Sequence, residues 1–270
     1  MVNFTPFTDK HFNRMIKLRE LLSESLVLMK GHWLQAVAVF FVFNLIIGLV
    51  QAIPGIGSFL SLLVSGPFLV GVSLYCVKIV NDNFPKFEDL LFGFQFNLGN
   101  NILAYFIIIP IVAVVGILLM ILFLLINFAI FLLIISIVYT QSYEAFVDTM
   151  EWEALLTPFR SLSYGLAAES IMLVLFCILS FCFSFILPWI IANIPFAMTF
   201  FIMAEDTSID AWDAVQKSWK MMKGYKFNFF VLNLFLLLLL TLIPFTLFIG
   251  LLWYIPFSYV VTANYYEKIK

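Results

Sequence analysis

The residues that most often carry out chemistry in proteins are scarce in this sequence, and their spacing predicts no reactive centre. The two histidines, His11 and His32, both fall in the N-terminal segment and do not have the spacing of metal ligands. The three cysteines, Cys76, Cys177 and Cys182, lie inside apolar runs and match no metal or redox motif, so we expect packing or lipid-facing residues. The sequence has no glycine-rich phosphate loop, no HExxH motif and no nucleophile elbow. It therefore predicts no catalytic site, no metal site and no cofactor in a protein that is not an enzyme.

Carboxylates gather at the ends of the apolar runs, where Asp82, Glu88 and Asp89 form one group and Glu205 and Asp206 another. Solvated carboxylates are usual at helix boundaries, and metal binding or acid catalysis is the alternative. Ionisable residues inside a membrane usually mark proton relays and ion-coupled transport, but the apolar runs contain no Asp, Glu, Lys or Arg. The sequence therefore gives little support to ion-coupled transport.

Amides are the main polar groups inside the apolar runs, and they most often form bonds between helices. Three of them are candidates for lining a polar cavity, and a passive pore lined by amides is an alternative: Asn44, Asn233 and Asn264.

Long apolar runs must position all of these residues. The chain has 270 residues, of which 64% are hydrophobic and 11% charged, whereas a soluble domain carries about 25% charged residues. A helix that spans a bilayer needs about 20 apolar residues. The sequence predicts an all-α, polytopic transmembrane helical bundle that forms a single domain over residues 1–270, because four long runs are free of charge: 33–77, 99–143, 170–204 and 227–266.

The basic residues predict how the chain is oriented in the membrane. All of the 14 Lys and Arg residues except Arg160 fall in four short segments: 1–32, 78–98, 205–226 and the C-terminal tail. Short basic segments stay on the cytoplasmic side of a membrane. We therefore expect a bacterial cytoplasmic (inner) membrane protein with both termini in the cytoplasm, in contact with the lipid bilayer and not with nucleic acid. The first thirty residues are too charged for a cleavable signal peptide.

The runs predict six spans, two of which form each of two helical hairpins. Residues 33–80 form hairpin 1, which turns at Ile53-Pro54-Gly55-Ile56-Gly57, and residues 227–270 form hairpin 2, which turns at Ile243-Pro244. Residues 101–204 supply the central spans.

The central spans also hold an acidic insertion, residues 140–169, which we expect on the non-cytoplasmic side. Two apolar stretches, 102–139 and 170–204, are longer than a hydrocarbon layer of about 30 Å requires. Either each spans once as a long helix that tilts or kinks at a proline, or each doubles back to give eight spans. We favour long helices because no turn residues interrupt positions 117–126.

The two hairpins resemble each other in sequence. The segment from Ser25 to His32 aligns with the segment from Ser218 to Tyr225, and each precedes an apolar helix and an Ile-Pro pair. A second proline and a closing Lys-Ile pair follow in both copies. Both copies enter from the same side, so this is a parallel repeat. It would enclose a substrate pathway between two similar halves or serve only to pack duplicated hairpins.

Amphipathic segments are expected at the cytoplasmic interface. The main one is a helix over residues 207–224, with an apolar stripe that we expect to face the membrane: Ile209, Trp212, Val215, Trp219 and Met222. Its candidate interfacial or lipid-contact residues are Trp212, Lys217, Trp219, Lys220 and Lys223. Two further cytoplasmic interfacial segments are expected within residues 1–32 and 81–100.

Several short motifs together resemble a bacterial family of integral membrane proteins of unknown function, which is related to the YciC-like group and to the membrane domain of some glycerophosphodiester phosphodiesterases. The resemblance covers most of the chain but not residues 120–170, which look like an insertion. It implies a six-span membrane protein and no assigned activity. The motifs are Met29 to Trp33, Ile53 to Gly57, Gly66 to Gly71, Phe87 to Phe94, Ala211 to Gly224, Ile255 to Phe257 and Tyr265-Tyr266.

Two functions are compatible with these features. The first is a non-enzymatic multi-pass membrane protein that acts as an accessory or scaffold for another membrane component, through the helix at 207–224 and the loop at 140–169. The second is a transporter or lipid-handling protein with a cavity between the repeated hairpins. The sequence leaves the oligomeric state, the partner and any substrate open.

Overall fold

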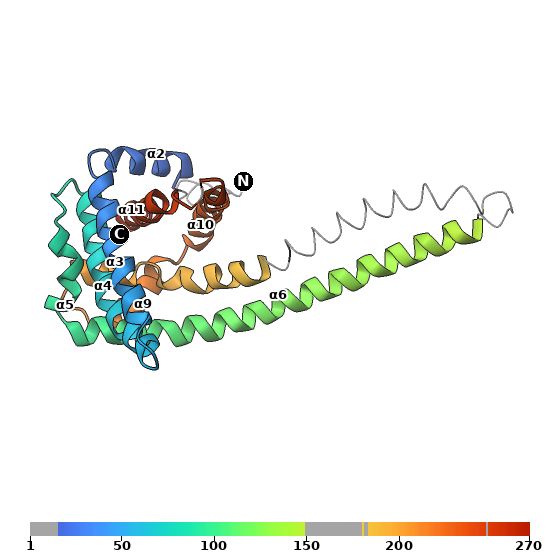
Figure 1. The fold of residues 1–270 in the computed structure, drawn as a ribbon, viewed down its shortest axis with the longest axis horizontal. Helices are drawn as coiled ribbons and strands as arrows, with labels where there is room; N and C mark the ends of the chain where they lie inside the picture. The colour runs from blue at the N-terminus through green and yellow to red at the C-terminus, as the bar shows by residue number, and fades with distance from the viewer. Residues whose placement is uncertain (1–15, 149–179, 181–182, 247) are drawn as a thin grey trace, which may run out of the picture. The chain divides into compact units, whose positions relative to one another are not determined.

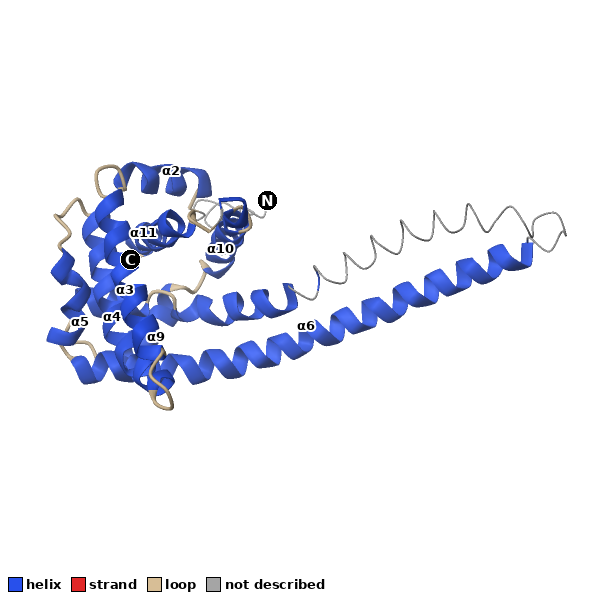
Figure 2. Ribbon diagram, viewed as in Figure 1, coloured by secondary structure: helices blue, strands red, loops and turns tan. Residues whose placement is uncertain are grey.

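Helices joined by turns and short loops make up the part of the chain that the computed structural model describes, which comprises residues 16–148, 180, 183–246 and 248–270 (Figures 1 and 2). The predicted all-α class is confirmed for these residues. His11, Cys177, Cys182 and most of the acidic insertion 140–169 lie outside the described residues. The chain divides into two units, residues 1–111 with 193–270 and residues 112–192.

The first unit contains most of the helices. In chain order they are α2 (Leu18–Leu28), α3 (Trp33–Gln51), α4 (Gly57–Val80), η1 (Phe87–Leu91), α5 (Phe92–Gln95), the start of α6 (Leu98–Asp148), η3 (Ile194–Phe196), α8 (Thr199–Glu205), α9 (Ala211–Met221), α10 (Lys226–Leu240), η4 (Ile243–Thr246) and α11 (Leu251–Ile269).

Two short helices, α2 and α9, each precede a longer apolar helix and end in the same way. Each has 11 residues, and each is followed by a glycine with a positive φ, +88° at Gly31 and +98° at Gly224. Only glycine adopts this backbone conformation at little cost, and it stops a helix so that the chain can change direction. The angle between α9 and α10 is 92°.

Helix α4 forms the centre of the first unit. It packs against α3, α8, α11 and the η1–α5 segment, and 61% of its span is buried, compared with 17% for α3. Glycines bring backbones into direct contact at this centre, because a Cβ added to Gly71 would meet the carbonyl of Leu90 and one added to Gly93 would meet the carbonyl of Pro67. The phenylalanine-rich segment therefore lies directly against α4.

Helix α6 is continuous from Leu98 to Asp148, 51 residues, and passes through Pro110 without a break. At 1.5 Å per residue this is about 76 Å of helix. The stretch 102–139 therefore does not double back, as predicted. The other long stretch, which we also expected to span once, is described only in its later part, where η3 at Pro195 interrupts the helix before α8.

The second unit, residues 112–192, contains the later part of α6 and the described residues that precede Asn193. The Asn127 amide donates to the Ser184 hydroxyl at 2.7 Å. A Cβ at Gly116 would lie 3.2 Å from the Trp189 ring. A polar bond and a small-residue contact thus join the two sides of this unit, as is common between helices in membranes.

Four helices of the described residues are long and apolar enough to cross a membrane: Trp33–Gln51, Gly57–Val80, Leu98–Leu133 and Phe183–Glu205. The bent pair α9–α10 would make a fifth. The structure supports several spans, and the total of six stays a prediction.

Candidate functional site: a polar end of the first unit

The four segments that were predicted to lie in the cytoplasm, in so far as the structure describes them, meet at one end of the first unit. We call this end the polar end, and it comprises residues 16–35, 78–101, 205–228 and 264–270, which include the first residues of the adjoining apolar helices. Lys268 pairs with Glu24 at 2.6 Å, and the Gln35 amide donates to the Pro85 carbonyl at 2.8 Å. The Asn228 amide donates to the Ile16 carbonyl at 3.1 Å. Segments far apart in the sequence therefore share one polar surface.

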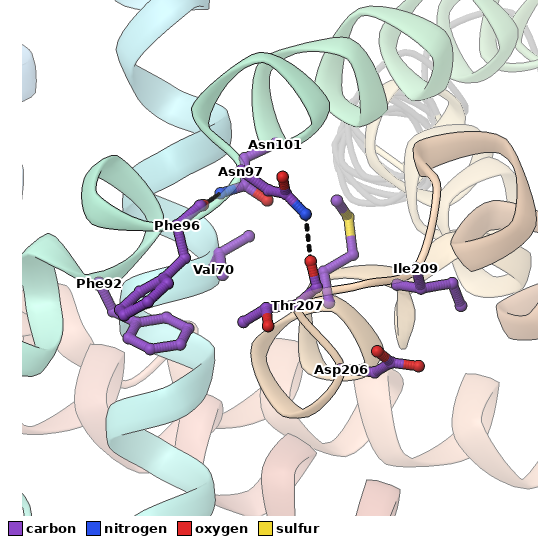
Figure 3. Close-up of a pocket in the computed structure, with 9 residues that line it drawn as sticks. Val70, Phe92, Phe96, Asn97, Asn101, Asp206, Thr207 and Ile209 are labelled. Atoms are coloured by element: carbon purple, nitrogen blue, oxygen red, sulfur yellow. Dashed lines mark hydrogen bonds between the residues drawn. The ribbon is translucent and has the colours of Figure 1, made fainter.

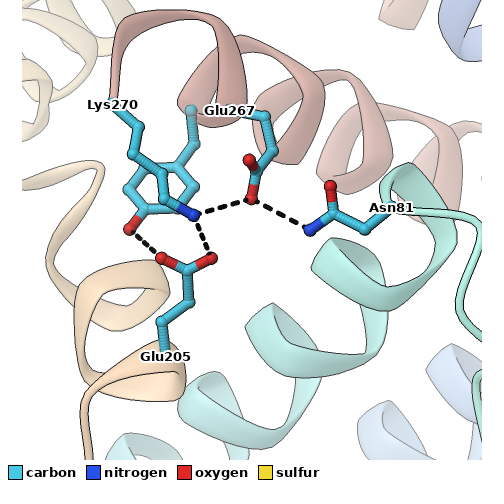
Figure 4. A network of polar contacts seen from close by, with 5 residues as sticks. Asn81, Glu205, Glu267 and Lys270 are labelled. Atoms are coloured by element: carbon cyan, nitrogen blue, oxygen red, sulfur yellow. Dashed lines mark hydrogen bonds and ion pairs between the residues drawn. The ribbon is translucent and has the colours of Figure 1, made fainter.

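A network of five residues holds the C-terminus to the polar end (Figure 4). Lys270 Nζ lies 2.6 Å from Glu205 Oε1 and 3.5 Å from Glu267 Oε1. The Tyr266 hydroxyl donates to Glu205 Oε2 at 2.8 Å, and the Asn81 amide donates to Glu267 at 3.2 Å. The hydrogen bond to Glu205 raises the pKa of Lys270 above its ordinary value. Glu205 thus serves as an acceptor that joins α8 to α11.

A second ion pair fixes η1 against α4. Lys78 Nζ lies 2.7 Å from Asp89 Oδ1, with side-chain exposures of 30% and 11%. The other Asp89 oxygen accepts the Lys86 backbone N–H at 2.8 Å. The prediction of a solvated carboxylate at position 89 is therefore wrong. Asp89 is nearly buried and both of its oxygens are bonded.

Two asparagines at the start of α6, Asn97 and Asn100, hold the loop that precedes α9, and Figure 3 shows the bond of Asn97 to Thr207. The Asn97 amide donates to the Thr207 carbonyl, and the Asn100 amide donates to the Ile209 carbonyl at 2.7 Å. Asn100 Oδ1 accepts the Ala211 N–H at 2.9 Å. No side chain of the α9 N-cap, Asp210, caps this helix, so Asn100 of α6 supplies the missing acceptor.

The third asparagine of this group, Asn101, closes the opposite side. Its amide donates to the carbonyls of Gly93 and Phe96 at 2.7 and 2.8 Å. The space that these loops surround is too narrow for a water molecule. The three asparagines therefore act as a clasp, in which Asn97 and Asn100 join the α6 start to the α9 loop and Asn101 joins it to α5, rather than as a ligand site.

Replacing Asn100 with alanine is expected to loosen α9 while the rest of the first unit stays folded. The change removes both the cap of α9 and the bond to Ile209, and the loss of a helix cap costs about 1 kcal/mol. Amide hydrogen exchange of residues 211–221 in detergent should become faster, with α4 unchanged. The matched control is Asn81→Ala, which removes an amide of the polar end that does not touch α9. Equal exchange in α9 for both variants would contradict this role of Asn100.

Four of the candidate lipid-contact residues lie on the side of α9 that faces away from the protein, and Lys223 is exposed just after the end of this helix. Trp212 and Trp219 are 53% and 48% exposed, and Lys217, Lys220 and Lys223 are exposed. The residues that face the protein are mostly small, and they are Ala211, Ala214, Val215 and Ser218. The residues of the predicted apolar stripe therefore do not share one face. Trp212 and Trp219 face outward, whereas Val215 and Met222 are buried against the protein.

Aromatic and basic side chains of this outer surface of α9 also contact each other. Lys226 Nζ lies 4.2 Å above the Trp219 ring, and Trp219 packs on Phe196 with ring centroids 5.7 Å apart. A cation held against tryptophan suits the headgroup region of a bilayer, where both groups find partners.

The three candidate cavity residues do not bond to one another. The Asn44 amide donates to the Phe40 carbonyl at 2.7 Å, and the Asn233 amide donates to the Phe229 carbonyl at 2.8 Å, each one turn back in its own helix. Asn264 is buried and donates to the Ser25 hydroxyl at 3.1 Å. The geometry therefore gives no support to a shared polar cavity at these residues.

Sequence reasoning did not find the contacts that organise the polar end. The asparagine clasp had one visible mark, three asparagines within five positions at the start of an apolar run. The pairing of Lys78 with Asp89 and of Lys270 with Glu205 had none, because ion pairs between distant segments depend on how the helices pack. Among the described residues no group of three or more His, Cys, Asp or Glu side chains could hold a metal ion.

These features define the class of the protein. It is all-helical in its described part, and several of its helices are long and apolar enough to cross a membrane. The chain belongs to the family described as "Protein of unknown function (DUF975)", whose model matches residues 15–270. The resemblance to a family of unknown function is thereby confirmed, while the relation to the YciC-like group and to glycerophosphodiester phosphodiesterases stays a prediction. Neither the comparison with curated proteins nor that with solved structures gives a match.

Proposed function

We propose that this chain is a non-enzymatic, six-span protein of a bacterial inner membrane that serves as an accessory or scaffold for another membrane component. Both termini would lie in the cytoplasm, and the outer surface of α9 would be the contact surface. The observation that carries the proposal is this surface, where exposed tryptophans and lysines stand on a helix that is firmly anchored on its other side.

The anchoring of α9 supports a fixed docking surface. The Ser218 hydroxyl is fully buried, donates to the Pro195 carbonyl at 2.8 Å and accepts the Met198 N–H at 3.2 Å. Asn100 holds the other end of the helix. A surface whose backbone is held at both ends loses little entropy when a partner binds.

The contacts of the polar end support the proposed orientation. The Lys268–Glu24 and Lys270–Glu205 pairs join the C-terminus of α11 to the end of α8 and to α2. Segments that bond to each other must lie on the same side of a membrane. Basic segments gather on the cytoplasmic side, so the common side would be the cytoplasm.

The parallel repeat belongs to the same proposal and is supported by matching details of α2 and α9. Both helices contain a buried serine that bonds to a neighbouring element, Ser25 with Asn264 and Ser218 with Pro195. Both are followed by a fully buried methionine, Met29 and Met222. The two hairpins would then be copies that pack against a shared core. We also propose that the family of this chain is related to the YciC-like group and to the membrane domain of glycerophosphodiester phosphodiesterases.

The test is purification of the tagged protein from its own membranes in a mild detergent. We expect a stoichiometric partner, and we expect Trp212→Ser to reduce its recovery severalfold, because exposed tryptophans are frequent hot spots of interfaces. The matched control is Trp253→Ser, which removes a tryptophan of similar exposure, 49%, from α11. A wild-type protein recovered alone, or equal recovery from both variants, would count against the proposal.

A further inference from the structure

Three lysines at the end of α9 that leads into α10 have no negative charge beside them. Lys220 and Lys223 are exposed and Lys226 is half-buried, and none of the three forms an ion pair with a carboxylate that the structure describes. The sequence between Asp213 and Glu267 contains no Asp or Glu. The three lysines therefore form a positive patch whose charge no described part of the chain balances.

The turn after α9 brings these lysines to one place. The Lys223 N–H donates to the Lys220 carbonyl at 3.1 Å, and Gly224, with its positive φ, then leads the chain into α10. Lys226 Nζ lies 4.2 Å above the ring of Trp219, the chain neighbour of Lys220. The patch thus consists of Trp219, Lys220, Lys223 and Lys226, which we call the α9–α10 corner.

The position of the corner in the chain indicates which anion lies beside it. Lys226 is the first residue of α10, and the run that follows, Phe227 to Tyr266, has no charged residue. With α10 across the membrane, the three ammonium groups stand where the hydrocarbon ends and the lipid phosphates begin. Tryptophan is frequent at the same depth, and lysines there attract anionic lipids.

We propose that the α9–α10 corner binds the phosphate groups of anionic phospholipids. A second copy of this chain would place lysines against lysines, and like charges in contact repel. An acidic protein would have to displace the headgroups that surround the end of a spanning helix. The inference deepens the proposed function and rests on its placing of α10 across the membrane. It leaves Trp212, two turns earlier on α9, to the partner protein.

The test is a titration of the full-length protein in mild detergent with phosphatidylglycerol and, separately, with phosphatidylcholine of the same acyl chains, followed by native mass spectrometry. We expect tighter binding of phosphatidylglycerol. Lys223→Gln should weaken this binding about 5-fold, the equivalent of about 1 kcal/mol. Combining it with Lys220→Gln and Lys226→Gln should remove most of the preference for phosphatidylglycerol. The binding of phosphatidylcholine should not change.

Two controls separate charge at the corner from charge in general. Lys223→Arg keeps the positive charge and should keep the preference for phosphatidylglycerol. Lys17→Gln removes a lysine whose charge Glu20 already balances at 3.0 Å, so it should leave the preference unchanged.

Equal binding of the two lipids by the wild type would overturn the inference, and so would an unchanged preference in the triple variant. A triple variant that kept its lipid preference but lost a co-purified protein would assign the corner to that protein and also overturn the inference. Trp212→Ser separates this inference from the proposed function, because it should reduce the recovery of the partner and leave the lipid preference intact.

Discussion

Replacing Gly71 with alanine is expected to lower the stability of the protein by about 3 kcal/mol, the upper part of the range for overpacked cores. The new methyl group would meet the carbonyl group of Leu90 and lie 2.9 Å from the Asp89 carbonyl oxygen. Both contacts are to backbone atoms, which cannot rotate away as a side chain does. The η1 segment would have to move off α4, and the nearly buried Asp89 would move with it.

The measurement is the melting temperature of the purified protein in detergent, followed by loss of the monodisperse species on heating. A loss of this size corresponds to a decrease of several degrees. Gly93→Ala should behave in the same way, because its methyl group would meet the Pro67 carbonyl. The control is Gly99→Ala, where no atom lies within 4 Å. Equal melting temperatures for Gly71→Ala and Gly99→Ala would show that the packing of η1 on α4 is looser than described.

Replacing Lys78 with methionine is expected to cost about 3 kcal/mol, because it leaves Asp89 nearly buried without its cation. The loss of one partner of a buried pair costs about 3–5 kcal/mol, and the 30% exposure of Lys78 places this pair at the lower end. Asp89→Asn should cost less, since an asparagine oxygen still accepts the Lys86 N–H. The double variant should be more stable than Lys78→Met, because no unpaired charge remains.

A double-mutant cycle in the same melting assay checks this interaction. Coupling between residues in direct contact is about 0.5–3 kcal/mol, and we expect a value in the upper half. Lys268→Met with Glu24→Gln is the control cycle. This pair has a similar distance, 2.6 Å, but exposures of 33% and 49%, and exposed pairs contribute about 0–1 kcal/mol. Additive losses at Lys78 and Asp89 would contradict a structural role of the pair.

The position of each helix was largely predictable, because hydrophobic runs and backbone-breaking residues are local. The run that starts at Trp33 gives α3, Gly224 ends the segment of α9, and the absence of turn residues in 117–126 gives one continuous α6. The side of α9 that faces the protein was harder to predict. The apolar stripe of the sequence pattern includes both Trp212 and Val215, but the small residues Ala211, Ala214 and Ser218 allow close packing and decide which side is buried.

The candidate site was predictable only in its location. Basic segments marked the polar end, because charge near an apolar run is visible in the sequence. Which carboxylate meets which lysine depends on the packing of α4, α8 and α11, and Glu205 and Lys270 are separated in the chain by α9, α10 and α11. The three cavity candidates were chosen for polarity alone, and polarity does not distinguish an amide that bonds to its own helix, as Asn233 does, from one that lines a pore.

The length of α6 has a consequence for the medium around it. Its charge-free part, Gly99 to Tyr143, measures about 67 Å along the axis, and membrane helices lean by about 40° at most. At that inclination a hydrocarbon layer of about 30 Å accommodates about 39 Å of helix. The remaining 28 Å or so is apolar helix beyond the reach of the acyl chains at this inclination. Exposure of such a surface to water is costly, so we expect either protein or a locally thicker bilayer to cover the outlying turns of α6.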